Sequence, residues 1–167
     1  LGYVPQKGVL FSGTIDSNIR YGKTDISEAE VKEAAEIAQA TEFIDAKPEK
    51  YTSPIAQGGT NVSGGQKQRL SIARAIAKKP EIFIFDESFS ALDFKTDSTL
   101  RKALKEHTKD ATTIIVAQRI STILNADKII VLDDGHMAGI GTHGELMKNC
   151  EVYRQIAMSQ LSEEELA

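Results

Sequence analysis

Apolar residues recur every three or four positions in two stretches of the chain, which is the spacing of a helix with one buried side. The first stretch follows Ser27, and Glu30 completes a capping box with it, so we predict a helix over 27–40. The second stretch follows Ser63, which can cap the start of a helix, and Pro80 ends it. Each of these helices therefore has one apolar side.

Two other segments lack this spacing and are predicted to be strands. Residues 82–85 form a continuous apolar run, and 112–117 is a second such strand; both are expected to be buried in a parallel sheet. Asp86 and Glu87 follow the first strand, and Gln118 follows the second. Ligands of such sheets bind at the carboxyl ends of the strands, so these three residues mark the expected place of the chemistry.

The rest of the chain alternates between further strands and helices. This alternation predicts an α/β fold around a parallel sheet. Two stretches rich in Gly, Ser or Pro, 7–23 and 47–60, are expected to be mainly loop. The further predicted strands are 1–4, 128–132 and 136–141, with a hairpin turn at 134–135, and the further helices are 96–107, 121–125, 144–149 and 152–160.

Composition changes this picture little. Of the 167 residues, 41% are hydrophobic and 26% are charged, and the net charge is −4. This balance is typical of a globular domain and disfavours a nucleic-acid-binding surface. No apolar run approaches the ~20 residues of a membrane helix, and the single cysteine, Cys150, excludes an internal disulfide. Because the sequence starts at Leu1 within a strand-like stretch, we expect it to be part of a longer protein.

Ser63, Gly64 and Gly65 have the chemistry of a phosphate site. Backbone N–H groups at a helix start lack partners, and the helix dipole favours an anion there. Glycines also let a phosphate approach the backbone closely. Taken alone, the same three residues fit a plain capped turn equally well.

Four motifs, in order and spacing, resemble those of ATP-binding cassette (ABC) ATPases. Residues 62–70 resemble the signature motif, and 82–87 resemble the Walker B strand. Residues 90–93 resemble the D-loop, and 3–6 resemble the Q-loop. The resemblance implies a P-loop NTPase-like parallel-sheet core with an inserted α-helical subdomain, and it implies that the first part of the domain is missing.

The chain is most similar to the exporter subfamily, which fuses a membrane domain to the ATPase. The segments that carry this similarity are 8–15 and 18–19; 94–97 and 159–167 resemble one half of heterodimeric bacterial exporters. The resemblance implies that 1–167 is part of one ABC ATPase domain, with a helical subdomain at about 27–79. The core remainder is then about 80–160, and 161–167 is a C-terminal tail.

The resemblance also implies roles in binding and hydrolysing ATP with Mg²⁺. Asp86 would hold the metal ion through a water, since magnesium keeps most of its hydration. Glu87 would polarise the attacking water as general base. Gln6 would reach both the metal ion and that water. The alternative without a catalytic role is that Asp86 and Glu87 are only solvent-exposed polar residues at a strand end and that Gln6 is an exposed loop residue.

Two ABC domains form a head-to-tail dimer in this family, so the resemblance implies a second ATPase domain as partner. Ser63, Gly64, Gly65 and Gln66 would then serve an ATP bound mainly to that partner. Asp93 would signal across the dimer interface, and its alternative role is to cap the following helix. Other implied partners are the transmembrane domains of the chain and of its partner; no nucleic acid is implied.

Two departures from the family stand out. No Gly-x-x-x-x-Gly-Lys-Ser/Thr motif occurs, so this chain alone should bind ATP poorly and be inactive. Gln118 stands where the family has a histidine that contacts the γ-phosphate. Glutamine can hydrogen-bond but cannot take up a proton. The substitution is either tolerated or the mark of a slow, degenerate site.

The sequence therefore predicts the ATPase part of an ABC exporter at the cytoplasmic face of the cell membrane, paired in a heterodimer. The alternative is a largely non-hydrolytic half that lends its signature motif to a partner's active site. A soluble ABC ATPase of DNA repair or translation is a further rival, which the exporter-like segment 10–19 disfavours. The sequence does not reveal the transported substrate.

Overall fold

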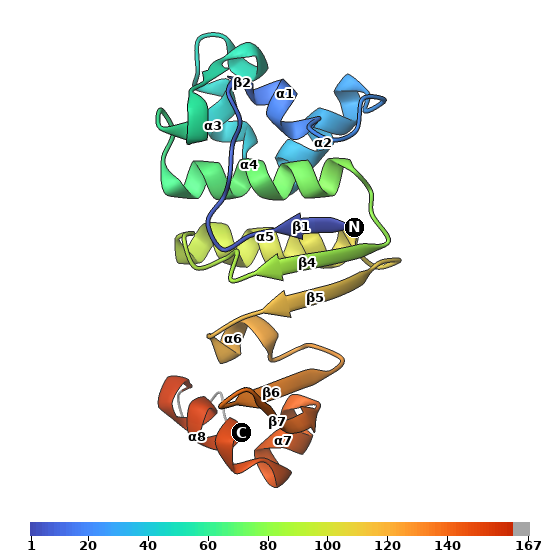
Figure 1. Cartoon of the computed structure of the whole chain (residues 1–167), viewed down its shortest axis with the longest axis vertical. Helices are drawn as coiled ribbons and strands as arrows, with labels where there is room; N and C mark the ends of the chain where they lie inside the picture. Colours follow the sequence, from blue (N-terminus) through green and yellow to red (C-terminus); the bar gives the residue numbers. More distant parts are fainter. Residues whose placement is uncertain (162–167) are drawn as a thin grey trace. The chain divides into compact units, whose positions relative to one another are not determined.

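The computed structural model describes residues 1–161 and divides into two compact units, Leu1–Val116 and Ala117–Ala167. Each unit has its own cluster of buried hydrophobic side chains. Of the predicted tail, residues 162–167 lie outside the described part. Figure 1 shows the order of the elements along the chain.

The first unit is built on a three-stranded parallel sheet with the order β1-β4-β5 (Figure 1). The strands are β1 (Gly2–Val4), β4 (Ile82–Asp86) and β5 (Thr112–Val116). In the register, Val4 lies beside Phe85, so the chain leaves β1 and β4 at the same edge of the sheet. The predicted parallel sheet is confirmed.

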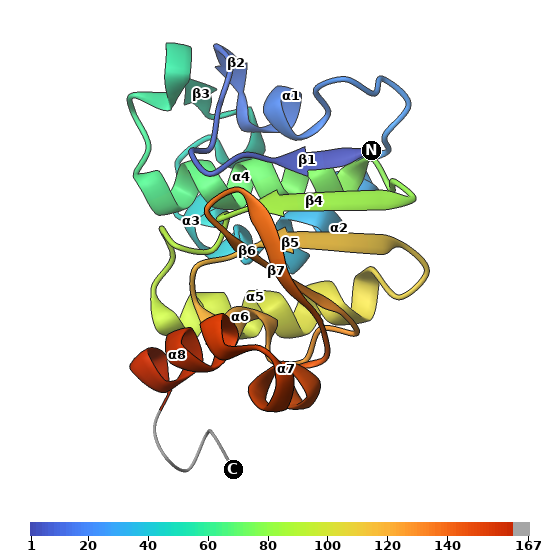
Figure 2. The ribbon, with the colours of Figure 1, turned by 60° about the horizontal axis from the view of Figure 1, so that its bottom comes forward.

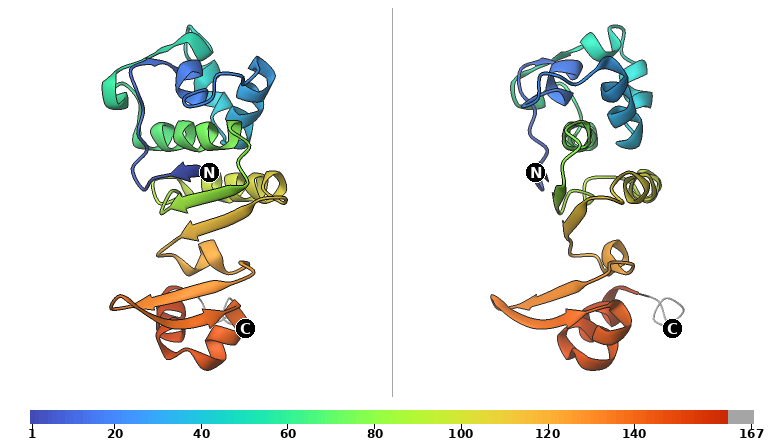
Figure 3. Two further views of the ribbon diagram at one scale, coloured as in Figure 1. Left: turned by 45° about the vertical axis from the view of Figure 1, so that its right-hand side comes forward. Right: turned by 90° about the vertical axis from the view of Figure 1, so that its right-hand side faces the viewer.

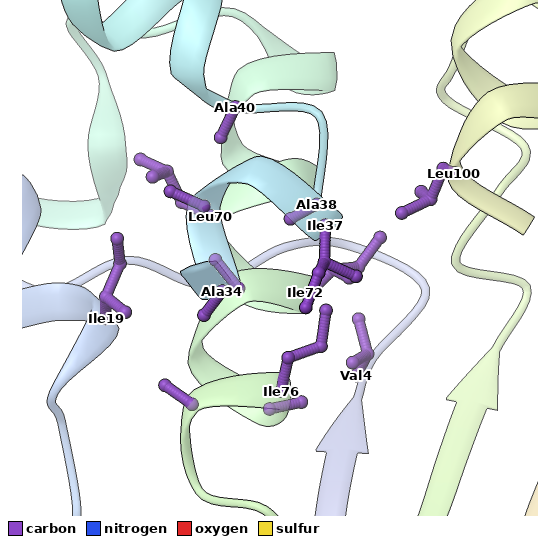
Figure 4. Packing of buried hydrophobic residues seen from close by; sticks show 14 of the residues in the cluster. Val4, Ile19, Ala34, Ile37, Ala38, Ala40, Leu70, Ile72, Ile76 and Leu100 are labelled. Atoms are coloured by element: carbon purple, nitrogen blue, oxygen red, sulfur yellow. The ribbon is translucent and has the colours of Figure 1, made fainter. Parts of the chain in front are cut away.

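Helices α4 (Gly64–Ala77) and α5 (Phe94–His107) lie on one side of this sheet (Figure 3, right). On that side, Val4 is buried in one cluster with side chains of both helices (Figure 4). On the other face, Ile114 and Val116 are 49% and 48% exposed. The expectation of strands buried on both faces is therefore wrong for β5 and for the start of β4, where Ile82 is 42% exposed, because α4 and α5 cover only one side of the sheet.

The predicted starts of the helices that follow Ser27 and Ser63 are confirmed. Helix α2 (Glu28–Ile37) begins after Ser27, whose hydroxyl oxygen accepts a hydrogen bond from the backbone N–H of Glu30. Helix α4 has the same capping box, formed by Ser63 and Gln66. Helix α2 ends three residues before the predicted Ala40, where Gln39 adopts a φ of 56°. A short helix, α3 (Thr41–Asp45), follows.

The two predicted loops contain structure. Within 7–23, β2 (Gly13–Thr14) leads into α1 (Ile15–Ile19), and both terminal isoleucines of α1 are fully buried. The stretch is mainly loop as predicted, but α1 was missed because its five residues are too few to show a period; Thr14 and Ser17 form its capping box. The predicted loop 47–60 includes η1 (Lys50–Thr52), β3 (Pro54–Ile55) and η2 (Gln57–Gly59).

Between residues 117 and 161, the second unit contains an antiparallel hairpin and three helices, which Figure 2 shows from another side. Its core includes the buried Tyr153, whose hydroxyl lies 2.8 Å from Nδ1 of His143. The predicted hairpin and helices of this region are confirmed within one or two residues. The elements are α6 (Ile120–Ile123), β6 (Ile129–Asp133), β7 (His136–Gly141), α7 (His143–Asn149) and α8 (Glu151–Gln160).

Leu70 of α4 is fully buried in the core of the first unit (Figure 4). We expect Leu70→Ala to lower the free energy of unfolding by about 2–5 kcal/mol, because it removes buried methyl groups and leaves a cavity. Thermal unfolding of the complete protein measures this. The matched control is Leu132→Ala, at a side chain that is 69% exposed; equal unfolding temperatures for both variants would contradict the assignment of Leu70 to the core.

Candidate functional site

The chain segments that leave β1 and β4 bring Gln6 and Glu87 together. The side-chain amide nitrogen of Gln6 donates a hydrogen bond of 2.8 Å to Oε2 of Glu87. The contact arises because β1 and β4 are parallel neighbours, so that residues just past their ends become neighbours too. Two residues that are 81 positions apart are thus brought into one candidate site at the carboxyl edge of the sheet.

Asp86 is held from the same segment. The hydroxyl of Tyr3 on β1 donates to Oδ2 of Asp86 at 3.2 Å. Partial desolvation, and then this hydrogen bond and the charge of Asp86, raise the pKa of Tyr3 above its ordinary value. Both members of the acidic pair therefore receive a hydrogen bond from the segment 3–6.

Glu87 has an unusual backbone. Its φ is 44°, a left-handed value that costs a non-glycine residue free energy and often occurs at functional sites. Neighbouring groups hold it in place: its N–H donates to the carbonyl of Val116 at 2.9 Å, and its own carbonyl accepts from the hydroxyl of Ser90 at 2.9 Å. This turn directs the chain away from β4 immediately after the acidic pair.

The signature segment forms the start of α4, as predicted. The hydroxyl of Ser63 accepts a hydrogen bond from the N–H of Gln66, and the side chain of Gln66 returns to the N–H of Ser63. A side chain at Gly64 would meet no atom within 4 Å, so this position is open. The first N–H groups of a helix have no intrahelical partner, so an anion can bind there.

Asp93 caps the next helix, α5. Its carboxylate accepts hydrogen bonds from the backbone N–H and the hydroxyl of Thr96, at 3.0 and 2.6 Å. The Thr96 hydroxyl and then its N–H hold the pKa of Asp93 below its ordinary value. The alternative role of Asp93 as a helix cap is therefore present; its role between domains stays a prediction. A Cβ at Gly65 would lie 3.5 Å from the carbonyl oxygen of Ala91, which places the signature segment beside the D-loop-like segment.

Gln118 belongs to the second unit, whereas the other predicted site residues belong to the first. Its backbone carbonyl accepts a hydrogen bond of 2.9 Å from the side-chain amide of Gln160. The side-chain oxygen of Gln160 also accepts a hydrogen bond of 2.9 Å from the N–H of Ile120. Helix α8 thus fixes the backbone that follows β5.

The residues at the sheet edge fit a magnesium nucleotide. Within residues 1–161, no three His, Cys, Asp or Glu side chains gather closely enough to hold a metal ion by themselves. Magnesium suits such a place, since it binds through one or two carboxylates, water and phosphate oxygens. Asp86 offers a carboxylate. Gln6 offers its amide oxygen, since its contact with Glu87 uses the amide nitrogen.

Sequence reasoning missed three side chains that organise this site. Tyr3 bonds to Asp86, and two buried side chains, Gln68 and Ser88, bond to backbone carbonyls next to Gln6. Gln68 and Ser88 are 1% and 0% exposed. No signal in the sequence marks Gln68 or Ser88, because both have charged neighbours and the carbonyls that they bind lie more than 60 positions away.

A sequence model of a known family, described as ABC transporter, matches residues 1–90. The chain belongs to the ABC transporter family. The matched range includes the acidic pair, the signature segment and Gln6. No helix within residues 1–161 is long and apolar enough to span a bilayer.

Relatives and a solved structure refine the ABC assignment. The chain is 46% identical to an uncharacterised ABC transporter ATP-binding protein of Bacillus subtilis, across 98% of this chain and 28% of that one. It is 45% identical to human ATP-binding cassette sub-family B member 5, across 96% of this chain and 13% of that one. A bacterial Atm1-family ABC exporter with ATP bound is 40% identical, with a TM-score of 0.92 over 97% of this chain and 29% of that one.

These matches show an ATPase domain of exporter type with a P-loop NTPase-like fold, as the sequence predicted. The chain spans little more than a quarter of the length of its bacterial relatives.

Proposed function

We propose that the chain is part of an ATPase domain that binds and hydrolyses ATP to power an ABC exporter, with Glu87 as the general base. The observation that carries this proposal is the contact between Gln6 and Glu87, next to Asp86, at the carboxyl edge of the parallel sheet. In this arrangement Asp86 and Gln6 would hold the magnesium ion of the nucleotide. Bound Mg²⁺ supplies charge stabilisation for the transferring phosphoryl group.

Glu87 suits the role of base because it is one residue past Asp86 and is already hydrogen-bonded to Gln6. Its left-handed backbone is fixed by Val116 and Ser90, so that the carboxylate starts from a defined position. A base held in this way can take the proton of a water that is bound beside the Gln6–Glu87 pair. Positioning of this kind is the main contribution that a protein makes to phosphoryl transfer.

We further propose that the signature segment serves an ATP held mainly by a second ATPase domain. The open start of α4 supports this, since Ser63, Gly64, Gly65 and Gln66 present a helix N-terminus of a long helix rather than a closed pocket. Asp93 lies in the adjacent segment and would contact the partner domain. We also propose that the chain associates with transmembrane domains at the cytoplasmic face of the membrane, which the names of exporter relatives support.

The helical subdomain at about 27–79 and the core remainder at about 80–160 remain our proposed divisions of the domain. Helices α2 and α4 pack against each other within the first of these segments (Figure 1). The heterodimeric pairing also remains a proposal, and it rests on the similarity of 94–97 to one half of heterodimeric exporters.

Gln118 supports a second candidate function, in which this chain contributes a slow site and mainly lends its signature segment. If the slow site results from the missing imidazole, Gln118→His should raise ATP turnover by about 10-fold or more, because proton transfer by a positioned histidine contributes at least that much. The measurement is steady-state hydrolysis by the complete protein with its partner. An unchanged rate would mean that glutamine is tolerated and would favour the first function.

A further inference from the structure

The loop that carries Gln6 is fastened to the signature helix. The side-chain amide of Gln68, on α4, donates a hydrogen bond of 3.0 Å to the carbonyl of Pro5, the residue before Gln6. Gln68 is 1% exposed, so its side-chain amide is shielded from water and depends on this part-buried bond for a partner. A buried amide that loses its partner is strongly unfavourable, and this makes the bond a firm attachment.

A second contact, independent of this hydrogen bond, attaches the loop to α4 on the other side of Gln6. The backbone at Gly8 lies directly against α4: a Cβ there would be 2.9 Å from both the carbonyl carbon and the carbonyl oxygen of Lys67. Backbone atoms cannot move aside as the end of a flexible side chain can. The segment 5–8 is therefore pressed against the part of α4 that contains Lys67 and Gln68, within the signature segment 62–70.

The other end of the loop is tied to the acidic pair. The hydroxyl of Ser88, a fully buried residue, donates to the carbonyl of Val4 at 2.8 Å. The carbonyls of Val4 and Pro5 are thus held by two different elements, one by the residue after Glu87 and the other by α4. Gln6 follows directly, so its position is determined jointly by the two attachments.

From this arrangement we propose that Gln68 is a positioning residue that makes Gln6 and the signature helix move as one body. The inference rests on the proposed function, in which Gln6 serves the nucleotide of this chain and the signature segment serves that of a partner. Binding of the partner's ATP at the start of α4 is then transmitted through Gln68 and Gly8 to the position of Gln6 beside Glu87. The two nucleotide sites are linked within a single chain by one buried hydrogen bond and one backbone contact.

The test uses Gln68→Met, which keeps the length of the side chain and removes the donor. In the complete protein with its partner, we expect kcat for ATP hydrolysis to fall about 10-fold or more, since small displacements of catalytic groups have effects of that size. The KM for ATP should stay within about 2-fold, because Gln68 is buried and is not among the residues proposed to bind nucleotide. Gly8→Ala should give the same result from the other side of the contact, by pushing the loop away from α4.

The matched control is Ser71→Ala on the same helix. Ser71 is 3% exposed, and its hydroxyl has no hydrogen-bond partner within the described residues, so its removal should change neither constant. A second readout does not depend on turnover: in nucleotide-free protein, amide hydrogen exchange of the segment around Gln6 should be faster in Gln68→Met than in Ser71→Ala.

Equal exchange and equal kcat in Gln68→Met and Ser71→Ala would overturn the proposal. Glu87→Gln is measured in parallel, so that a failure of the proposed function can be distinguished from a failure of the proposed role of Gln68. If turnover is insensitive to Glu87→Gln, the proposed function is wrong, whereas the exchange experiment still decides whether Gln68 fastens the loop. If Glu87→Gln is inactive and Gln68→Met is unaffected in both readouts, only the role of Gln68 is wrong.

Discussion

Gly64→Asp should reduce ATP hydrolysis by the complete protein about 100-fold or more. The substitution places a carboxylate at the open start of α4, where the account has a phosphate bind to backbone N–H groups. Repulsion between like charges then replaces an attractive interaction, and removal of a single donor to a transition-state oxyanion already has an effect of this size. Turnover in membranes or detergent, together with any partner subunit, measures it.

The fold should tolerate the change, because a side chain at this position meets nothing within 4 Å. Gly144→Asp is the matched control, since Gly144 lies in the first turn of α7 and is equally open. Both variants add a negative charge near a helix N-terminus, where it favours the helix. Equal activity of Gly64→Asp and Gly144→Asp would rule out a nucleotide at the signature segment.

Glu87→Gln should lower steady-state turnover about 100-fold or more while ATP binding is retained. The amide has nearly the size of the carboxylate and can still bond to Gln6, but it cannot accept the proton of an attacking water. Glu81→Gln, at an exposed residue just before the opposite end of β4, controls for the loss of one charge.

The pattern across both variants distinguishes the two candidate functions. Loss of activity in both supports hydrolysis through Glu87. Loss in Gly64→Asp with activity largely kept in Glu87→Gln would instead mean that this chain lends its signature segment to a site that it does not own.

The sequence predicted those parts of the fold in which local chemistry decides the structure. Ser27 and Glu30 form the expected capping box, and Ser63 caps α4, because such caps depend only on residues within one turn. The apolar run before Asp86 forms β4 for a similarly local reason. The helix α1 was missed because its five residues are too few for a period, and its burial depends on contacts with α4.

Predictions that depend on distant parts of the chain were less complete. The burial expected of β5 fails because its second face has no cover within the described residues, which no property of 112–117 reveals. For the site, resemblance indicated Gln6, Asp86 and Glu87, and the structure adds how Gln6 meets Glu87. Gln68 lies within the recognised signature segment, yet its role depends on the carbonyl of Pro5, 63 positions away.

The central claim is that Glu87 performs the proton transfer of ATP hydrolysis, and a single-turnover experiment tests it most directly. Product release or opening of the dimer can limit steady-state rates, so they can hide the chemical step. Complete protein in excess over radiolabelled ATP and Mg²⁺ would be quenched at intervals, and bound ATP and ADP would be separated. We expect the wild-type protein to convert the bound ATP to ADP, whereas Glu87→Gln should keep it intact. Formation of ADP by Glu87→Gln at the wild-type rate would contradict the account.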